Sequence, residues 1–335
     1  NATAHWDEDD RIKVWTSTQG AFPVRTSTAA ILDMDVSRIK VTPLEIGGGF
    51  GGKIPVYLEP VVSILSKKSG RPVKAIMERS NVFQASGPAP GGTITVKMGT
   101  DKDANIIAAE TSIKLEAGGF PGAAVGAAVQ CIFAPYDIPN TRIDGYDIVV
   151  NKPKSAAYRA PGSPQAAFAA ETVSDELARI HNMDPIDFRL QNASKEDTRR
   201  ADGVVFPKIG DVEVLEAAKA SDHWKSDLGT PPKGRVRGRG VASGYWFNVG
   251  LKSAVSLTVN NDGSVALVEG STDIGGTRTS ISMQAAEVLG IGVENFIPSV
   301  GDTDTAGYAD VTGGSRTTYA TGFAAVKAAE NLIEV

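Results

Sequence analysis

Hydrophobic and polar residues follow two periods along this chain, and each period predicts a different kind of element. Apolar residues at every second position predict strands, which we place at residues 11–16, 38–46, 73–78, 93–99, 106–117, 142–150, 238–246, 253–260 and 264–269. Apolar residues spaced three or four apart predict helices, which we place at residues 22–32, 55–69, 164–180, 185–191, 279–289 and 317–334. No period in the sequence is short enough for a repeat fold.

Turn residues mark where these elements end and where the chain divides. Asp101-Lys102-Asp103 and Asn261-Asp262-Gly263 each predict the turn of a hairpin. The polar stretch around Pro231-Pro232 is the best candidate for a boundary between subdomains. A chain of 335 residues also favours two or more folding units. We therefore predict a first subdomain, a linker and a second subdomain at residues 1–221, 222–236 and 237–335.

Three glycine-rich loops stand ahead of predicted helices. The first, at residues 47–53, has five glycines in six positions before Lys53, which packing cannot explain because glycine has no side chain and costs backbone entropy. The other two lie at residues 273–277 and 312–316. Main-chain N–H groups in such loops bind anions, especially at a helix N-terminus. We expect the three loops to converge on one large phosphate-bearing cofactor.

Composition and charge exclude several other classes of site. A net charge of −5 gives no reason to expect nucleic acid as a partner. Cys131 is the only cysteine and there are three histidines, so the chain cannot ligate an iron–sulfur cluster through cysteines or readily build a histidine metal site. No apolar run has membrane-spanning length and no signal peptide opens the chain. We expect a cytoplasmic protein that does not bind membranes.

The first glycine loop also fits two nucleotide-binding patterns. Gly47 and Gly52-Lys53 have the spacing of a nucleotide-triphosphate loop, but Ile54 stands where serine or threonine must bind magnesium. The same glycines fit the dinucleotide fingerprint, with Glu78 at a tolerable distance for a ribose contact. Farther along the chain come a long hairpin and a glycine-rich loop, and not the alternating strands and helices that a Rossmann sheet needs. A dehydrogenase of the NAD type nevertheless stays open as an alternative.

Four motifs in order carry a resemblance to a known family. They are Thr18-Gln19, the stretch 48–53, Tyr158-Arg159-Ala160-Pro161-Gly162, and Gly301-Asp302-Thr303-Asp304 with Gly314-Ser315-Arg316-Thr317-Thr318 after it. Together they resemble the molybdopterin-binding subunit of the xanthine dehydrogenase/aldehyde oxidase family over nearly the whole chain. The resemblance implies an α+β fold of two elongated subdomains, with the molybdenum cofactor where they meet. The metal's bonds would then come from the cofactor, which accounts for a redox protein with one thiol.

The resemblance assigns roles to individual residues. Gln19 would hydrogen-bond an oxygen ligand of molybdenum, and Arg159 would wall the substrate pocket beside the cofactor. Arg316 would contact phosphate or form an ion pair with Asp302 or Asp304, and both possibilities stay open. The full set of residues expected to bind the cofactor is Gly49, Phe50, Gly51, Gly52, Arg159, Ala160, Gly162, Gly275, Gly276, Thr277, Gly313, Gly314, Ser315, Arg316 and Thr317.

Three departures from the family pattern bear on the substrate and the cofactor. Ile54 stands where xanthine-oxidising members place a carboxylate, so we expect an aldehyde or an uncharged heteroaromatic compound instead of a purine. Ala160 stands where carbon monoxide dehydrogenases carry a copper-binding cysteine, which disfavours that activity. The sequence Ile274-Gly275-Gly276 lacks the glutamine of the family's Gly-Gln-Gly loop, which puts one pterin hydrogen bond in doubt.

The family's general base is a glutamate in a later Gly-Glu segment, which we do not find before Val335. We therefore expect a fragment that is inactive alone and belongs to a longer or multi-subunit oxidoreductase. The cofactor would be molybdenum-molybdopterin, possibly in its cytosine dinucleotide form, with no iron–sulfur or flavin group in this chain. The partners would be a small-molecule substrate, 2Fe-2S and FAD subunits or domains, and possibly further copies. The rival from another class is a non-catalytic cofactor-binding or assembly module.

Several residues have a plain structural interpretation. Ser163-Pro164 predicts a helix N-cap followed by its first position. Cys131 is expected to be a small buried hydrophobic residue. His181, at a predicted helix end, is expected to interact with the helix dipole. Asp302 and Asp304 are expected to brace a turn and not to bind a metal.

Overall fold

The computed structural model describes residues 1–334. The chain forms two compact units, each built from separate stretches of sequence. The first unit contains Asn1–Pro88, Ala156–Arg159 and Phe247–Val335, and the second contains Ala89–Ser155 and Ala160–Trp246. Both ends of the chain thus belong to the first unit. These units do not follow the predicted division at residues 222–236, which stays a prediction.

The N-terminal part of the first unit is a four-stranded sheet with helices packed on it. Its elements are β1 (Ala2–Trp6), β2 (Ile12–Thr16), α1 (Ala21–Leu32), β3 (Ile39–Pro43), α2 (Glu59–Ser69), β4 (Val73–Ala75) and α3 (Arg79–Ala85). The strand order is β3-β2-β1-β4, with β2 parallel to β3 and β1 antiparallel to both neighbours. Ile12 and Val14 are fully buried while Lys13 between them is exposed, which confirms the period of two.

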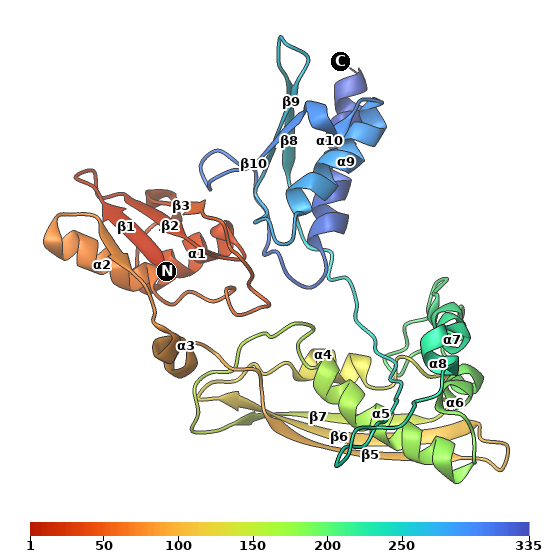
Figure 1. Cartoon of the computed structure of the whole chain (residues 1–335). Helices are drawn as coiled ribbons and strands as arrows, with labels where there is room; N and C mark the ends of the chain where they lie inside the picture. The colour runs from red at the N-terminus through yellow and green to blue at the C-terminus, as the bar shows by residue number, and fades with distance from the viewer. Residues whose placement is uncertain (335) are drawn as a thin grey trace. The chain divides into compact units, whose positions relative to one another are not determined.

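The C-terminal part of the first unit is a three-stranded sheet with two helices on one face (Figure 1). Its elements are β8 (Val255–Val259), β9 (Val265–Glu269), α9 (Thr277–Leu289), β10 (Phe296–Val300), a π-helical turn (Thr317–Thr321) and α10 (Gly322–Glu334). The strand order is β10-β9-β8, and the antiparallel β8–β9 hairpin confirms the predicted turn at Asn261-Asp262-Gly263. The predicted strand at 238–246 is wrong, because that segment is irregular and is held by side chains of other elements.

Thr303 joins these two parts of the first unit. Its N–H donates to the carbonyl of Val41 at 3.0 Å, and its hydroxyl accepts from the N–H of Val41 at 3.0 Å. Arg25 on α1 donates to the Thr303 carbonyl at 3.1 Å. The rings of Phe22 and Tyr308 also lie 5.2 Å apart. The two sheets of the first unit are therefore fixed to one another by contacts between residues far apart in sequence.

The second unit is a long sheet with a helix running along it (Figure 1). Its elements are β5 (Gly92–Thr100), β6 (Ile106–Gly118), α4 (Val125–Cys131), β7 (Thr141–Val149), α5 (Ser163–Ile180), α6 (Pro185–Asn192), α7 (Asp211–Ala220) and α8 (Asp222–Lys225). The order is β5-β6-β7, with β5 antiparallel and β7 parallel to β6. This confirms the predicted hairpin around Asp101-Lys102-Asp103. Residues such as Ile113, Leu115 and Phe188 form its core.

Two helix starts differ from their predictions. Helix α2 begins at Glu59 and not at residue 55, because the chain first makes a turn after the glycine loop. The first glycine loop therefore does not run directly into a helix. In α5 the N-cap is Gly162 in the left-handed region, and Ser163 is the first helical residue. The Ser163 hydroxyl donates to the carbonyl of Tyr245 at 2.7 Å and so does not cap the helix.

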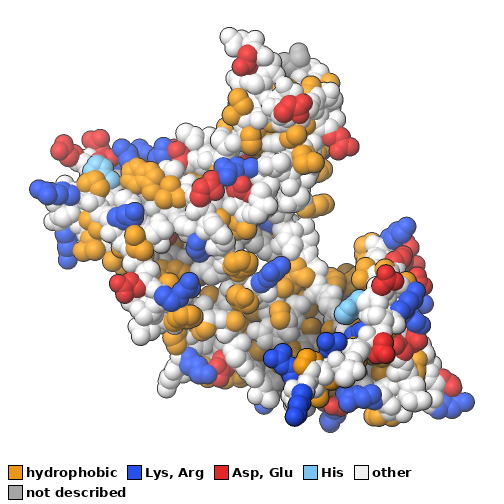
Figure 2. Space-filling view, in the orientation of Figure 1, with side chains coloured by type: hydrophobic (Ala, Val, Ile, Leu, Met, Phe, Trp, Pro, Cys, Tyr) orange, Lys and Arg blue, Asp and Glu red, His pale blue; other side chains and the backbone are white. Residues whose placement is uncertain are grey.

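Surface charge and the surroundings of two single residues complete the description of the fold. On the face drawn in Figure 2, basic and acidic side chains are interspersed and form no field of one sign. Cys131 is buried, as predicted. His181 is the C-cap of α5 and lies 2.7 Å from the hydroxyl of Thr100. Within residues 1–334 no helix is long and apolar enough to cross a membrane.

Candidate functional site

Gln19 joins two of the three glycine loops. It lies between β2 and α1 and is 2% exposed. Its side-chain Oε1 accepts from the N–H of Gly51 at 2.9 Å and of Lys53 at 3.2 Å. Its Nε2 donates to the carbonyl of Thr312 at 2.8 Å, and the N–H of Thr312 donates to the Gln19 carbonyl at 2.7 Å. Because two N–H groups face Oε1 and a carbonyl faces Nε2, the orientation of the amide is fixed.

The first glycine loop is shaped by contacts that only glycine allows. Gly51 has φ +98°, and a Cβ there would lie 2.5 Å from the carbonyl oxygen of Ala157. A Cβ at Gly49 would lie 2.6 Å from Cγ of Gln19. Phe50 adopts φ 53° and is 58% exposed, so its ring does not join the core. The loop packs directly on Gln19 and on the segment that leads to Arg159.

The backbone of Arg159 also reaches this loop. Its N–H donates to the carbonyl of Phe50 at 2.8 Å, whereas its side chain is exposed. The next residues of the same motif, Ala160 and Gly162, belong to the second unit. Ala160 has φ 53° and Gly162 has φ 85°, and a Cβ at Gly162 would lie 2.5 Å from the carbonyl oxygen of Ala124. The motif is therefore a tightly constrained turn.

The second glycine loop leads straight into α9. Gly276 is the N-cap with φ 87°, and nothing lies within 4 Å of a Cβ built on Gly275 or Gly276. Asp273 accepts from the hydroxyl of Thr277 at 2.9 Å and from Nε of Arg278 at 2.6 Å. Burial alone would raise the pKa of Asp273, but these two donors outweigh it and lower that pKa. The loop is fixed at its base and open at its glycines.

The third loop is linked to the other two. The hydroxyl of Thr312 donates to the carbonyl of Thr272, just before the second loop, at 2.7 Å. Through its contacts with Gln19, Thr312 also reaches the first loop. A Cβ on Gly313 would lie 3.5 Å from Cδ1 of Ile54. The first unit thus brings together Gln19 and every predicted cofactor residue except Ala160 and Gly162.

The Arg316 side chain is fully buried, and its contacts are neither the phosphate nor the aspartate ion pair that the sequence left open. All five N–H groups of its guanidinium donate within the protein, and burial lowers its pKa. The acceptors are the carbonyls of Gly250, Lys252, Asp310 and Val311 and the hydroxyl of Ser253. Asp302 pairs with Lys40 and Asp304 with Arg11, so the ion pair left open for Arg316 is not formed. The side chain also has no N–H left over for a phosphate.

Main-chain donors in the three loops suit an anionic cofactor. The following residues have N–H groups with no acceptor in the described part of the chain: Gly48, Gly49, Phe50, Gly275, Gly276, Gly313, Gly314 and Ser315. The hydroxyls of Thr272 and Thr317 are buried and also lack a partner there. Buried polar groups are normally satisfied, so free donors in neighbouring loops indicate a ligand with several acceptors. Within residues 1–334 there is no group of three or more His, Cys, Asp or Glu side chains that could hold a metal ion.

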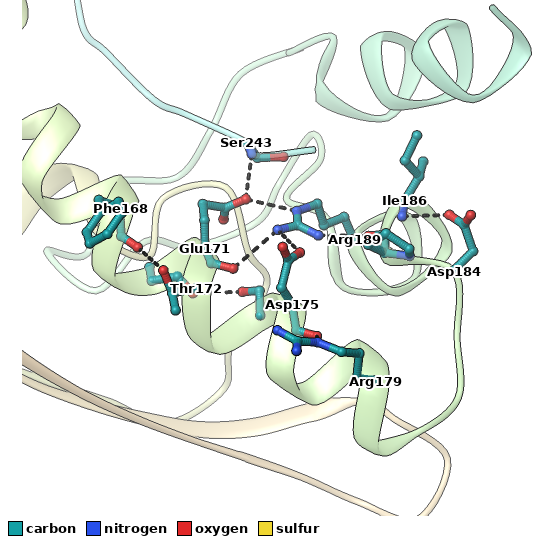
Figure 3. Close-up of polar contacts among 12 residues, drawn as sticks. Phe168, Glu171, Thr172, Asp175, Arg179, Asp184, Ile186, Arg189 and Ser243 are labelled. Carbon is teal, nitrogen blue, oxygen red and sulfur yellow. Dashed lines mark hydrogen bonds and ion pairs between the residues drawn. The ribbon is translucent and has the colours of Figure 1, made fainter. Parts of the chain in front are cut away.

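The second unit contains a buried charge network that sequence analysis missed (Figure 3). Arg189 is fully buried, with Nε 2.8 Å from Glu171 and Nη2 2.8 Å from Asp175. Glu171 also accepts from the hydroxyl of Tyr136 and the N–H of Ser243, each at 2.5 Å. Burial alone would lower the pKa of Arg189, but Tyr136 and Glu171 outweigh it and raise that pKa. A glutamate on the buried stripe of a predicted helix was the available signal.

Comparison with known families decides what kind of chain this is. Residues 1–193 match a family model described as a molybdopterin cofactor-binding domain, and residues 213–335 match a second model with the same description. The chain belongs to the molybdopterin cofactor-binding domain family. The resemblance carried by the four sequence motifs is thereby confirmed. Molybdopterin is the cofactor class of this family.

Curated relatives extend the comparison to named subunits. The chain is 30% identical over 312 residues to the aldehyde oxidoreductase molybdenum-binding subunit PaoC of Escherichia coli O157:H7. It is 31% identical over 333 residues to the xanthine dehydrogenase molybdenum-binding subunit of the same organism. These alignments cover 90% and 94% of this chain but 41% and 44% of the relatives. The chain therefore spans less than half the length of these curated relatives.

Solved structures confirm the fold of the family. Quinoline 2-oxidoreductase from Pseudomonas putida 86 matches with a TM-score of 0.89 at 22% identity, over 99% of this chain and 46% of that one. The aldehyde oxidoreductase of Desulfovibrio desulfuricans ATCC 27774 matches with a TM-score of 0.85 at 24% identity, over 99% of this chain and 38% of that one. The predicted mixture of helices and strands in an α+β fold is thus confirmed.

Proposed function

We propose that this chain is the cofactor-binding part of a molybdenum hydroxylase, an oxidoreductase that hydroxylates a C–H bond with oxygen from water. The observation that carries the proposal is the connection made by Gln19 and Thr312. These two residues bring three loops with free main-chain N–H groups into one unit, as binding of one multiply anionic cofactor requires. When bound, the molybdenum cofactor supplies the redox chemistry and the metal-bound oxygen ligands.

Each part of the site has its own task in this proposal. Nε2 of Gln19 has two N–H bonds and uses one on Thr312, which leaves the other to donate to an acceptor on the cofactor. The free N–H groups of Gly275 and Gly276 stand at the N-terminus of α9, where the helix dipole also favours an anion. Those of Gly313 and Gly314 would bind further acceptors of the pterin or its phosphate.

The substrate class is a finer part of the proposal. Ile54 follows the glycine loop and approaches Gly313, so an apolar side chain stands beside the proposed cofactor site. A carboxylate there would favour a substrate with N–H donors, whereas isoleucine favours an apolar one. We therefore propose an aldehyde or an uncharged heteroaromatic substrate. The exposed ring of Phe50 is available as a second apolar contact.

The remaining parts of the reaction lie with partners in this proposal. A glutamate outside these residues would act as general base, and 2Fe-2S and FAD subunits or domains would carry the electrons away. We propose molybdenum-molybdopterin as the cofactor, with the cytosine dinucleotide as one form to be tested. The relatives named above are molybdenum-binding subunits, which supports such a division of tasks.

Elemental analysis tests the proposal directly. The protein is produced as the cell makes it, in a host that synthesises molybdopterin, and is analysed for molybdenum and for released pterin. We expect about one molybdenum per chain in the wild type and a clear loss in the Gly51→Val variant, whose side chain would occupy the space of Ala157. Gly99→Ala serves as the control, because Gly99 lies on β5 without a positive φ and nothing lies within 4 Å of a Cβ built on it. Absence of molybdenum from the wild type would overturn the proposal.

The distribution of free N–H groups also allows a non-catalytic cofactor-binding or assembly module, because binding alone needs no base. The two functions differ in what happens after loading. An enzyme subunit reconstituted with its partners reduces an electron acceptor when an aldehyde is added, whereas a module holds molybdenum and shows no such reduction. Tight binding of a dinucleotide without molybdenum would instead favour the dehydrogenase alternative.

A further inference from the structure

The Arg316 side chain holds together two stretches of main chain that are distant in sequence. Its Nε and Nη2 donate to the carbonyls of Gly250 and Lys252, at 2.8 and 2.7 Å. Its Nη1 donates to the carbonyls of Asp310 and Val311, each at 3.1 Å. A planar guanidinium with five donors is the side chain best suited to gather several carbonyls at once.

We call residues 248–253 the strap, because they form an irregular segment that lies along the third glycine loop. The strap has no regular secondary structure of its own. The N–H of Val249 donates to the carbonyl of Gly314 at 3.1 Å, and the side chain of Asn248 donates to the carbonyl of Ser315 at 2.9 Å. Carbonyls of this loop are thus occupied by the strap, while its N–H groups at 313–315 have no acceptor within residues 1–334.

Arg316 and Gln19 bind the same peptide group. The carbonyl of Val311 accepts from Arg316, and the N–H of the same peptide, on Thr312, donates to the carbonyl of Gln19. The next carbonyl, that of Thr312, accepts from Nε2 of Gln19. The orientation of the Gln19 amide therefore depends on a peptide whose other side is held by Arg316. A small rotation of that peptide would move the acceptor for Nε2.

The charge of Arg316 is unusual for a buried arginine. No acid lies within ion-pair distance of it in the described part of the chain. The carboxylate of Asp310 favours the charge from farther away, and it is itself bonded to the N–H of Lys252 and the hydroxyl of Tyr308. A buried charge without an ion-pair partner is costly, and the five hydrogen bonds of the guanidinium offset only part of that cost. The retained charge favours an anion at the neighbouring loop.

We propose that Arg316 is a positioning residue for Gln19 and the third glycine loop, acting through the Val311–Thr312 peptide and the strap. It orients Gln19 and keeps the N–H groups at 313–315 free, and its charge favours an anionic cofactor without direct contact. This inference rests on the proposed function for the identity of the anion. The geometric part, in which Arg316 fixes the peptide and the strap, stands without it.

Hydrogen exchange on the cofactor-free protein tests the geometric part. The variant Arg316→Gln removes both the planar five-donor guanidinium and its charge, whereas Arg316→Lys keeps only the charge. We expect the N–H groups of Val249 and Thr312 to exchange at least about tenfold faster in both variants, because local opening becomes easier. The β6 amides of the second unit should not change. Arg71→Gln serves as the control, since the Arg71 side chain is exposed and only its carbonyl is bonded.

The cofactor content of the two variants separates the positioning effect of the guanidinium from the effect of its charge. We expect molybdenum and pterin to be lost severalfold from Arg316→Gln and partly retained by Arg316→Lys, with melting temperatures of the two variants close together. Ser253→Ala, which removes one acceptor of the guanidinium, provides a milder variant if both substitutions prevent folding. In that variant the same two amides should exchange faster while cofactor content stays near wild type.

Two outcomes would overturn the inference. One is unchanged exchange at Val249 and Thr312 in all Arg316 variants. The other is an increase spread equally over the β1 and β2 amides, which shows general destabilisation and no positioning. A wild type without molybdenum would overturn the proposed function, and the exchange experiment would still decide whether Arg316 fixes the strap and the peptide. The two failures are therefore distinguishable.

Discussion

Arg189 in the second unit and Arg316 in the first are both fully buried, yet their surroundings are opposite. Arg189 lies against two carboxylates, those of Glu171 and Asp175, and forms a network in which charge is balanced (Figure 3). Arg316 is bonded to four carbonyls and a hydroxyl, with no carboxylate in ion-pair distance among residues 1–334. Carboxylates thus balance the positive charge of Arg189, whereas no carboxylate among the described residues pairs with that of Arg316.

The difference separates a structural network from the site that we propose to bind the cofactor. A network that satisfies its own charges needs no ligand, and its loss is expected to appear as lost stability. A buried charge beside loops with free N–H groups leaves a field that an anion can neutralise. Burial of an arginine alone therefore says little about function. The useful observation is whether its counter-charge is already present in the protein.

The largest effect should come from breaking the balanced network. Replacing Arg189 by methionine removes one partner and leaves the buried carboxylate of Glu171 without its cation. We expect the free energy of unfolding to fall by about 3–5 kcal/mol, measured by urea denaturation. Arg316→Met should cost less, because removing a charge that has no ion-pair partner also removes its desolvation cost. Equal losses for the two variants would contradict the comparison.

The exposed pair Arg142–Asp144 provides the control for that experiment. Its arginine side chain is 72% exposed, and the ion pair measures 2.9 Å. Surface pairs contribute roughly 0–1 kcal/mol, so Arg142→Met should have little effect. A loss as large as that of Arg189→Met would show that the assay does not report on burial. The double variant Glu171→Gln with Arg189→Met should recover part of the stability, because it removes both charges.

A second test concerns Glu269, a buried acid of the first unit that also lacks a partner. It ends β9, is fully buried, and neither carboxylate oxygen has a hydrogen bond within residues 1–334. Burial, and after it the charge of Asp273, raises its pKa from 4.5 to about 8. The folded protein therefore holds this proton more tightly than the unfolded chain. Stability from this group is greatest at low pH and falls as the pH rises toward the folded pKa.

Glu269→Gln should remove that dependence on pH. Relative to the variant, the wild type should lose about 1.4 kcal/mol of unfolding free energy per pH unit, or roughly 3 kcal/mol between about pH 5 and pH 7. Denaturation midpoints measured across this range for both proteins give the difference in slope. Parallel curves would mean that Glu269 is ionised in the folded state and has found a cation.

How much of the site could be predicted from the sequence depends on how far apart in sequence the contacting residues lie. The glycine loops and Gln19 were identified from local motifs, and the structure places them together. The hydrogen-bond partner of Gln19 could not be predicted, because Thr312 lies 293 residues away and no pattern in the sequence pairs the two residues. The same limit applies to Arg316, whose side chain was expected on a phosphate or an aspartate but lies on carbonyls of the strap.

The elements that were missed or misplaced have local explanations. Residues 238–246 alternate like a strand, but the segment pairs with no other strand and instead binds side chains of α5. Strand β10 carries Pro298, a residue type that is rare inside strands, and it nevertheless pairs in parallel with β9. Helix α4 is rich in glycine and alanine, so its sequence shows little periodicity. Tertiary contacts decided each of these cases.

A third prediction concerns Gln19, which belongs to the proposed cofactor site in the first unit. Gln19→Ala leaves the buried N–H group of Gly51 and the partly buried N–H group of Lys53 without their acceptor. We expect a loss of about 1–3 kcal/mol in unfolding free energy together with loss of molybdenum from the purified protein. Gln191→Ala is the matched control, since Gln191 is exposed and also donates to a carbonyl, at 2.7 Å. Full molybdenum content in Gln19→Ala would argue against its proposed role.

The smallest expected effect lies where the balanced network meets the irregular segment before the strap. Ser163 donates to the carbonyl of Tyr245, while Glu171, two turns along α5, accepts from the N–H of Ser243. Ser163→Ala removes one bond and leaves the charged anchor, so unfolding free energy should fall by only about 1 kcal/mol. Hydrogen exchange should quicken at residues 243–246 and not in the core of the sheet. If exchange there is unchanged, the bond from Ser163 does not hold the segment, and Glu171 and other contacts such as the bond from Arg200 to the Tyr245 hydroxyl fix it.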